Sequence, residues 1–85
     1  MKYLVESSLR EIPTPEILAM LPAETARGLE LDASGDREWL PMAADQSRAW
    51  QLFKAESLEA VQAIAQSFPL YPYMNTVITP VVEPQ

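Results

Sequence analysis

The stretch that decides the fold is Phe68-Pro69-Leu70-Tyr71-Pro72-Tyr73-Met74. Each proline removes a backbone donor and fixes φ, so a helix arriving from the N-terminal side must end by about Phe68. The following residues 75–82 are dense in β-branched side chains, which favour a strand. We therefore predict a stiff aromatic junction between a helix and a strand. Tyr71 and Tyr73 either plug the end of a core or place hydroxyls on the rim of a pocket.

The helix that enters this junction is preceded by a predicted pair of strands. Ser57 is a candidate N-cap, and the apolar residues after it recur at helical spacing. Before it, residues 37–43 and 47–55 both have strand-like composition and are separated by a short turn, as in a hairpin. Pro41 lies within the first of these strands, which predicts an edge position or a bulge.

The residue pattern of the N-terminal half predicts one strand, a loop and one helix. Residues 2–6 alternate as a strand, residues 7–15 read as a loop, and Thr14 is a plausible N-cap. A helix follows over residues 16–32, with either a kink at Pro22 or a short first turn that ends at Leu21 before the main helix restarts. Gly35 is expected to stop that helix.

The resulting order, β-α-β-β-α-β, is that of the ferredoxin-like α+β fold, an antiparallel four-stranded sheet with both helices on one face. A single domain over residues 1–85 would leave apolar side chains on the other face of the sheet. We therefore expect two copies to pack sheet to sheet as a dimeric α/β barrel, so that the partner is the protein itself, as a homodimer or a higher homo-oligomer.

Composition excludes several classes of function. The 85 residues include neither cysteine nor histidine, which removes thiolate and imidazole metal ligands and the usual nucleophiles and bases, so we expect no metal and no cofactor. The net charge of −6 argues against nucleic-acid binding. No apolar run is long enough to cross a membrane, and no signal peptide is recognisable, which predicts a cytoplasmic protein without a membrane partner.

The junction also carries a family resemblance. Phe68 to Met74, preceded by Ser57-Leu58-Glu59-Ala60, closely resembles the corresponding region of muconolactone delta-isomerases. The resemblance extends without a gap back to Gly35 and more loosely to the N-terminus. It implies a dimeric α/β barrel, often in higher oligomers, and a cofactor-independent 1,3-proton shift on a small unsaturated lactone acid. The pocket would lie between the sheet and the helices.

This chain departs from the family at the second strand. Where the isomerases place a histidine, it has Trp39, and where they follow with tryptophan and arginine, it has Pro41 and Met42. Those changes remove an acid/base group and a cation suited to a substrate carboxylate. The junction keeps its aromatic-Pro-Tyr-Met signature, and Glu24 falls near an acidic position of the family's first helix.

For an isomerase-type enzyme, the remaining acid/base candidates are carboxylates and tyrosines. Glu24 is the first choice among Glu6, Glu24 and Glu38, with its pKa raised by a partly apolar pocket. Tyr73 or Tyr3 would donate to an enolate oxygen. Arg27 or Arg48 would orient an anionic substrate. The full predicted substrate-binding set is Tyr3, Arg27, Trp39, Arg48, Trp50 and Tyr71.

Two alternatives stand beside the enzyme. One is a non-catalytic module, which binds a small organic acid or aromatic ligand or serves as an assembly unit, because two tryptophans, three tyrosines and four methionines could line an apolar pocket. The other, weaker alternative is a metal-independent monooxygenase of the same superfamily.

Overall fold

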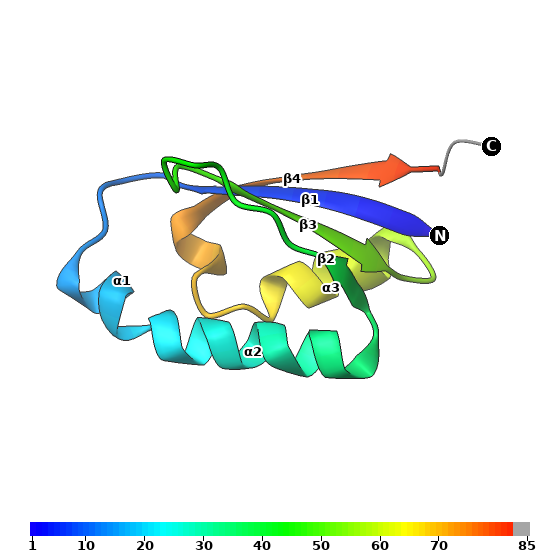
Figure 1. The fold of residues 1–85 in the computed structure, drawn as a ribbon, viewed down its shortest axis with the longest axis horizontal. Coiled ribbons are helices and arrows are strands. Elements are labelled where there is room, and N and C mark those ends of the chain that lie inside the picture. The colour runs from blue at the N-terminus through cyan, green and yellow to red at the C-terminus, as the bar shows by residue number, and fades with distance from the viewer. Residues whose placement is uncertain (83–85) are drawn as a thin grey trace.

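The computed structural model describes residues 1–82 and confirms the ferredoxin-like α+β class. The strands and helices, in chain order, are β1 (Lys2–Leu9), α1 (Pro15–Ala19), α2 (Leu21–Ser34), β2 (Arg37–Trp39), β3 (Ala49–Lys54), α3 (Leu58–Gln66), a single 3₁₀ turn (Tyr71–Tyr73) and β4 (Met74–Val81). The antiparallel sheet has the order β2-β3-β1-β4. Helices α2 and α3 lie together on one face of it (Figure 1).

The helix boundaries follow the local sequence signals. Thr14 and Ser57 cap α1 and α3, because their side-chain oxygens accept from the backbone N–H groups of Ile17 (3.3 Å) and Ala60 (3.1 Å). Gly35 ends α2 with φ of 82°, a left-handed conformation that glycine adopts without strain. Of the kink and the restart that were considered at Pro22, the structure is closer to the restart, since α1 ends at Ala19 and α2 begins at Leu21.

Three strand predictions were wrong at their ends. β1 continues to Leu9 where a loop was expected from residue 7, because its last residues pair with the start of β4. β2 stops at Trp39 rather than at residue 43, because a register shift interrupts its ladder and Pro41 then has no N–H to donate. β3 begins at Ala49 instead of residue 47.

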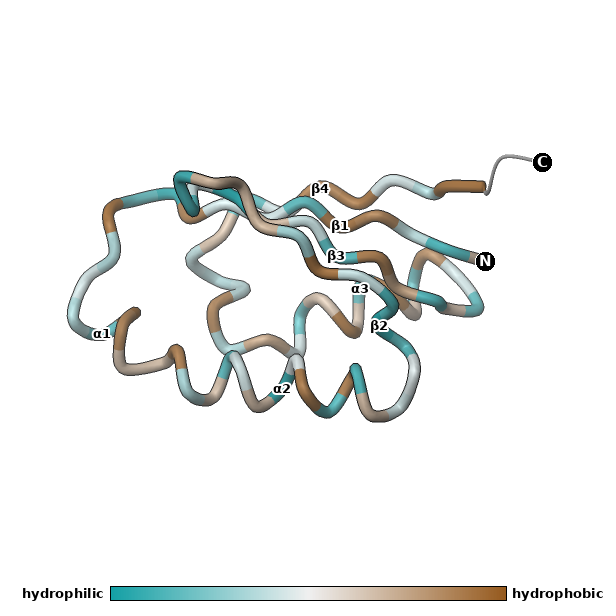
Figure 2. The backbone as a smooth tube through the Cα atoms, viewed as in Figure 1, coloured by the Kyte–Doolittle hydropathy of each residue, from teal (hydrophilic) through white to brown (hydrophobic). Residues whose placement is uncertain are grey.

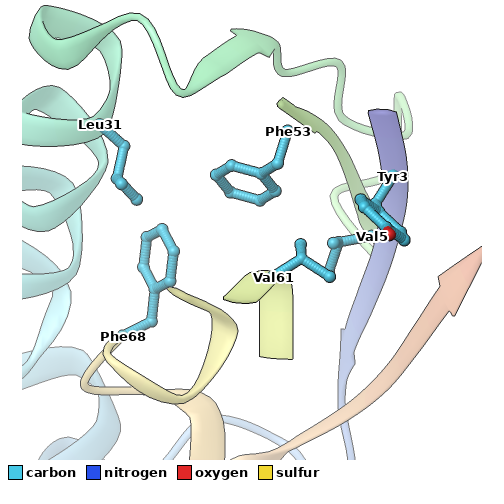
Figure 3. Packing of buried hydrophobic residues seen from close by; sticks show 6 residues of the cluster. All are labelled: Tyr3, Val5, Leu31, Phe53, Val61 and Phe68. Carbon is cyan, nitrogen blue, oxygen red and sulfur yellow. The ribbon is translucent and has the colours of Figure 1, made fainter. Parts of the chain in front are cut away.

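The main core lies between the sheet and the helices. Figure 3 shows side chains from β1, β3, α2, α3 and the junction converging there: Tyr3, Val5, Leu31, Phe53, Val61 and Phe68. The rings of Phe53 and Phe68 lie 6.5 Å apart at 59°. Such tilted aromatic pairs add to the stabilisation from burial. This packing fixes the junction against the middle of the sheet.

The opposite face of the sheet carries apolar side chains that no helix of the described chain covers. Leu4 lies opposite Leu52, which in turn faces Trp39, whose exposure is 56%. Val77 on β4 is 55% exposed. The helices lie only on the other side of the sheet in Figure 2.

Candidate functional site

A cavity of about 520 Å³ lies between α2, the junction and the helix-facing side of the sheet. Its lining is mostly apolar, with a few polar groups, as is typical of small-ligand sites. The sheet contributes Val5, Ser7, Arg37, Ala49, Gln51, Phe53, Met74 and Thr76, and the segment after β2 contributes Leu40 and Met42. The α3 end and the junction contribute Ala65, Phe68, Leu70 and Tyr71. One face of α2 contributes Leu21, Glu24, Thr25, Gly28, Leu29 and Asp32.

Glu24 is the carboxylate that the structure places between the helix and the junction. Its Oε1 accepts a hydrogen bond of 3.0 Å from the backbone N–H of Leu70. Burial raises the pKa of Glu24 above its ordinary value, and this outweighs the Leu70 hydrogen bond and the charge of Arg37, which both lower it. A carboxylate of this kind can accept a proton more readily than a fully solvated one.

Arg37 is the site residue that the sequence reasoning missed. It begins β2, and its guanidinium reaches back over α2, where Nε and Nη2 donate to the two carboxylate oxygens of Asp32 at 2.7 and 2.8 Å. Nη1 donates to Oε1 of the buried Gln51 at 3.0 Å. A Cβ on Gly28 would lie 2.8 Å from both Nη1 and Nη2. The glycine therefore permits the guanidinium to rest on the helix.

A signal for this contact was present in the sequence. Gly28 lies inside a helix, where glycine is unfavourable and often marks a close approach of another group. Asp32 follows one turn later, so both residues fall on the same helix face. The sequence did not show which cation would meet them, because that depends on how β2 returns to the sheet.

Of the predicted site residues, Glu24 and Tyr71 both line the cavity. Tyr3 is buried in the core, with its hydroxyl 3.6 Å from the sulfur of Met1. Tyr73 is half-buried in the 3₁₀ turn, and within residues 1–82 neither Tyr3 nor Tyr73 contributes to the cavity lining. The structure therefore does not bring the three tyrosines together around Glu24.

The other predicted substrate-binding residues do not line the cavity. Arg27 donates to Ser67 at 2.8 Å and to Glu30 at 3.1 Å. Trp39 is on the open face of the sheet. Arg48 and Trp50 both donate to Glu6, at 3.3 and 2.9 Å. Glu6 alternates with the buried residues of β1, so that cluster belongs to the open face as well.

Within residues 1–82, no three histidine, cysteine or acidic side chains gather as metal ligands. Over the same residues, no helix is long and apolar enough to cross a membrane.

The described residues form a ferredoxin-like fold with a mostly apolar cavity between the sheet and the helices. The family model of muconolactone delta-isomerase matches residues 1–85, and the chain belongs to that family. A crystal structure of muconolactone isomerase superposes with a TM-score of 0.85 at 20% identity, covering 98% of this chain and 90% of that one. A search of curated protein sequences returned no match.

Proposed function

We propose that this protein is an isomerase that catalyses a cofactor-independent proton shift on a small unsaturated acid or lactone. The observation that carries the proposal is Glu24, a partly buried carboxylate with a raised pKa that lines the cavity. Membership of the muconolactone delta-isomerase family supports the same class of reaction. Acid/base groups work best when their pKa lies near the working pH, and burial moves Glu24 in that direction.

In this reaction Glu24 removes a proton from a carbon next to a carbonyl-conjugated system. The electron pair of the broken C–H bond delocalises into an enolate, and the same carboxyl group returns the proton at the far carbon of the allylic unit. No electrons are gained or lost overall. We assign Tyr71 as the donor to the enolate oxygen, because it is the predicted tyrosine that lines the cavity with Glu24.

The test compares Glu24→Gln with Glu30→Gln against a panel of unsaturated lactone acids. Both residues lie on α2, but Glu30 is exposed and pairs with Arg27. The readout is the NMR signal of the allylic protons, followed in H₂O and in D₂O. We expect Glu24→Gln to lower turnover by about 10²–10⁴-fold, the usual contribution of a general acid or base, and Glu30→Gln to leave it unchanged. Unchanged turnover in Glu24→Gln would refute the assignment of Glu24. Failure of the unmodified protein to turn over any member of the panel would instead favour a binding module.

We further propose that the protein assembles as a homodimer, sheet to sheet. Trp39 and Val77, both more than half exposed on the open face of the sheet, support this arrangement together with the half-buried Leu4 and Leu52, because an exposed apolar sheet face is a common interaction surface. A cytoplasmic location stays a prediction, supported by the absence of cysteine.

A further inference from the structure

We propose that the cavity takes an uncharged ligand and rejects carboxylates, so that the substrate of this chain is a neutral unsaturated lactone, ester or ketone. This inference rests on the proposed isomerase function and names the class of substrate for the same site. It follows from the charges of the lining, from the exposed side chains at the edge of the cavity and from the neutral polar groups on its walls.

The lining of the cavity carries more negative than positive charge. Glu24 and Asp32 contribute two carboxylates, and Arg37 contributes the one guanidinium among the lining residues of the described chain. With two negative groups against one positive group, the formal charge of the lining is −1 when both carboxylates are ionised. The surrounding side chains are mostly apolar, so these charges are screened less than they would be in open water. A ligand anion would therefore meet net repulsion.

The positive charge of Arg37 is already matched by Asp32. Nε and Nη2 donate to the two carboxylate oxygens at 2.7 and 2.8 Å, which is the bidentate geometry that suits a guanidinium and a carboxylate best. The third bond, from Nη1, goes to Gln51 at 3.0 Å. A ligand carboxylate would have to compete with Asp32 for this guanidinium and also lose its own water.

The proposed role of Glu24 also favours an uncharged substrate. Burial already raises the pKa of Glu24, and a second negative charge beside it would raise that pKa further. A bound carboxylate would thus keep Glu24 protonated, and a protonated carboxyl group cannot remove a proton from carbon. An uncharged substrate leaves Glu24 free to ionise and to act as the base.

The edge of the cavity is apolar. Four of the lining residues are 44–60% exposed, namely Leu21, Leu29, Leu40 and Met42. A ligand that enters past these side chains gives up water before it reaches the interior. Loss of water costs an ion far more than it costs a neutral molecule, so the edge also favours an uncharged ligand.

Neutral polar groups remain for recognition of such a ligand. The cavity is lined by the hydroxyl-bearing residues Ser7, Thr25 and Thr76. Ser7 and Thr76 lie opposite each other on β1 and β4, and Thr25 lies on α2. A hydroxyl group both donates and accepts a hydrogen bond, so it can bind the carbonyl or ring oxygen of a lactone without any charge.

Two probes of the same shape and different charge test the inference without knowledge of the true substrate. They are phenylacetamide, which is neutral, and phenylacetate, which is an anion. Each is titrated at neutral pH into ¹⁵N-labelled protein, while the backbone amides of the lining residues Gly28 and Leu70 are followed by NMR. We expect the unmodified protein to bind phenylacetamide at least about tenfold more tightly than phenylacetate.

Two variants change the charge of the lining one step at a time. Asp32→Asn brings the formal charge to zero and releases Arg37 from its carboxylate, so the preference should fall to about one. Asp32→Asn combined with Glu24→Gln brings the charge to +1, and the preference should reverse toward phenylacetate. The control is Glu30→Gln, which removes an exposed carboxylate of α2 outside the lining and should leave the preference unchanged.

Three results would each overturn the inference: equal or tighter binding of phenylacetate by the unmodified protein, no binding of either probe, or a preference that the double variant leaves unmoved. Should the double variant fail to fold, Asp32→Asn alone decides, because it should already remove the preference.

The turnover panel separates this inference from the proposed reaction. Methyl esters of the lactone acids should react faster than the acids themselves. Faster turnover of the acids would overturn the charge selectivity and leave the isomerase standing. Conversely, a preference for phenylacetamide together with unchanged turnover in Glu24→Gln would keep the charge selectivity and refute the catalytic role of Glu24.

Discussion

Replacement of Gly28 by alanine should change the free energy of unfolding through two effects of opposite sign. In an unconstrained helix interior the change stabilises by about 1 kcal/mol. Here the new Cβ would lie 2.8 Å from both terminal nitrogens of Arg37, too close for packing, so the guanidinium must leave its place. Loss of its bond to the buried Gln51 costs about 1.5–3 kcal/mol. We therefore expect a net destabilisation of about 0.5–2 kcal/mol.

The assay is urea unfolding at one fixed protomer concentration, since assembly would otherwise shift the apparent stability. Four proteins form the cycle: the unmodified chain, Gly28→Ala, Arg37→Ala and the double variant. With Arg37 shortened, the obstacle is gone, and Gly28→Ala should stabilise by about 1 kcal/mol. The effect thus reverses sign between the two backgrounds. Equal stabilisation in both would refute the close contact between Gly28 and the guanidinium.

Three further predictions concern stability and assembly. The pKa of Glu24 is raised in the fold, so the folded protein binds this proton more tightly than the unfolded chain does. The free energy of unfolding of the unmodified protein should therefore fall, relative to that of Glu24→Gln, as the pH rises from about 4.5 through the folded pKa, and should not change in this way below that range. Urea midpoints of the two proteins that run parallel across pH 4–8 would contradict this prediction. Phe53→Ala empties a fully buried site and should cost about 3–5 kcal/mol in urea unfolding, against almost nothing for the exposed Lys54→Ala. Val77 lies opposite Glu6, so a single protomer should tolerate Val77→Lys. A sheet-to-sheet dimer would bury the new charge, and the substitution should therefore lower the molecular mass measured by light scattering. An unchanged mass would show that Val77 is not part of the interface.

The fold was predictable because local and global signals agree in this chain. The caps at Thr14 and Ser57, the left-handed stop at Gly35 and the prolines of the junction each act within a few residues, and each ends or starts an element as expected. What failed was the length of the strands. Pairing between Leu9 and Met74 is a contact across the chain, so no local pattern around residues 7–9 could reveal it.

The site was predictable only in part, for a related reason. Glu24 lies on the first predicted helix and Tyr71 in the junction. The sequence indicated that the two elements face each other across a pocket, and both residues line the cavity. Arg37 was read only as the start of a strand, and its site role depends on a guanidinium that reaches back across the turn after α2. Arg48 was chosen for its charge, but its guanidinium donates to Glu6, which strand alternation in β1 places on the open face.

The same prolines that end the helix also prepare the carboxylate for its proposed chemistry. They hold the junction so that the N–H of Leu70 donates to Oε1 of Glu24 instead of to a neighbouring turn of helix. This bond favours the ionised carboxylate, while burial favours the protonated form. A group held between these opposing effects can both take up and release a proton. Since Oε1 is engaged by the backbone, Oε2 is the oxygen on which the transferred proton would be carried.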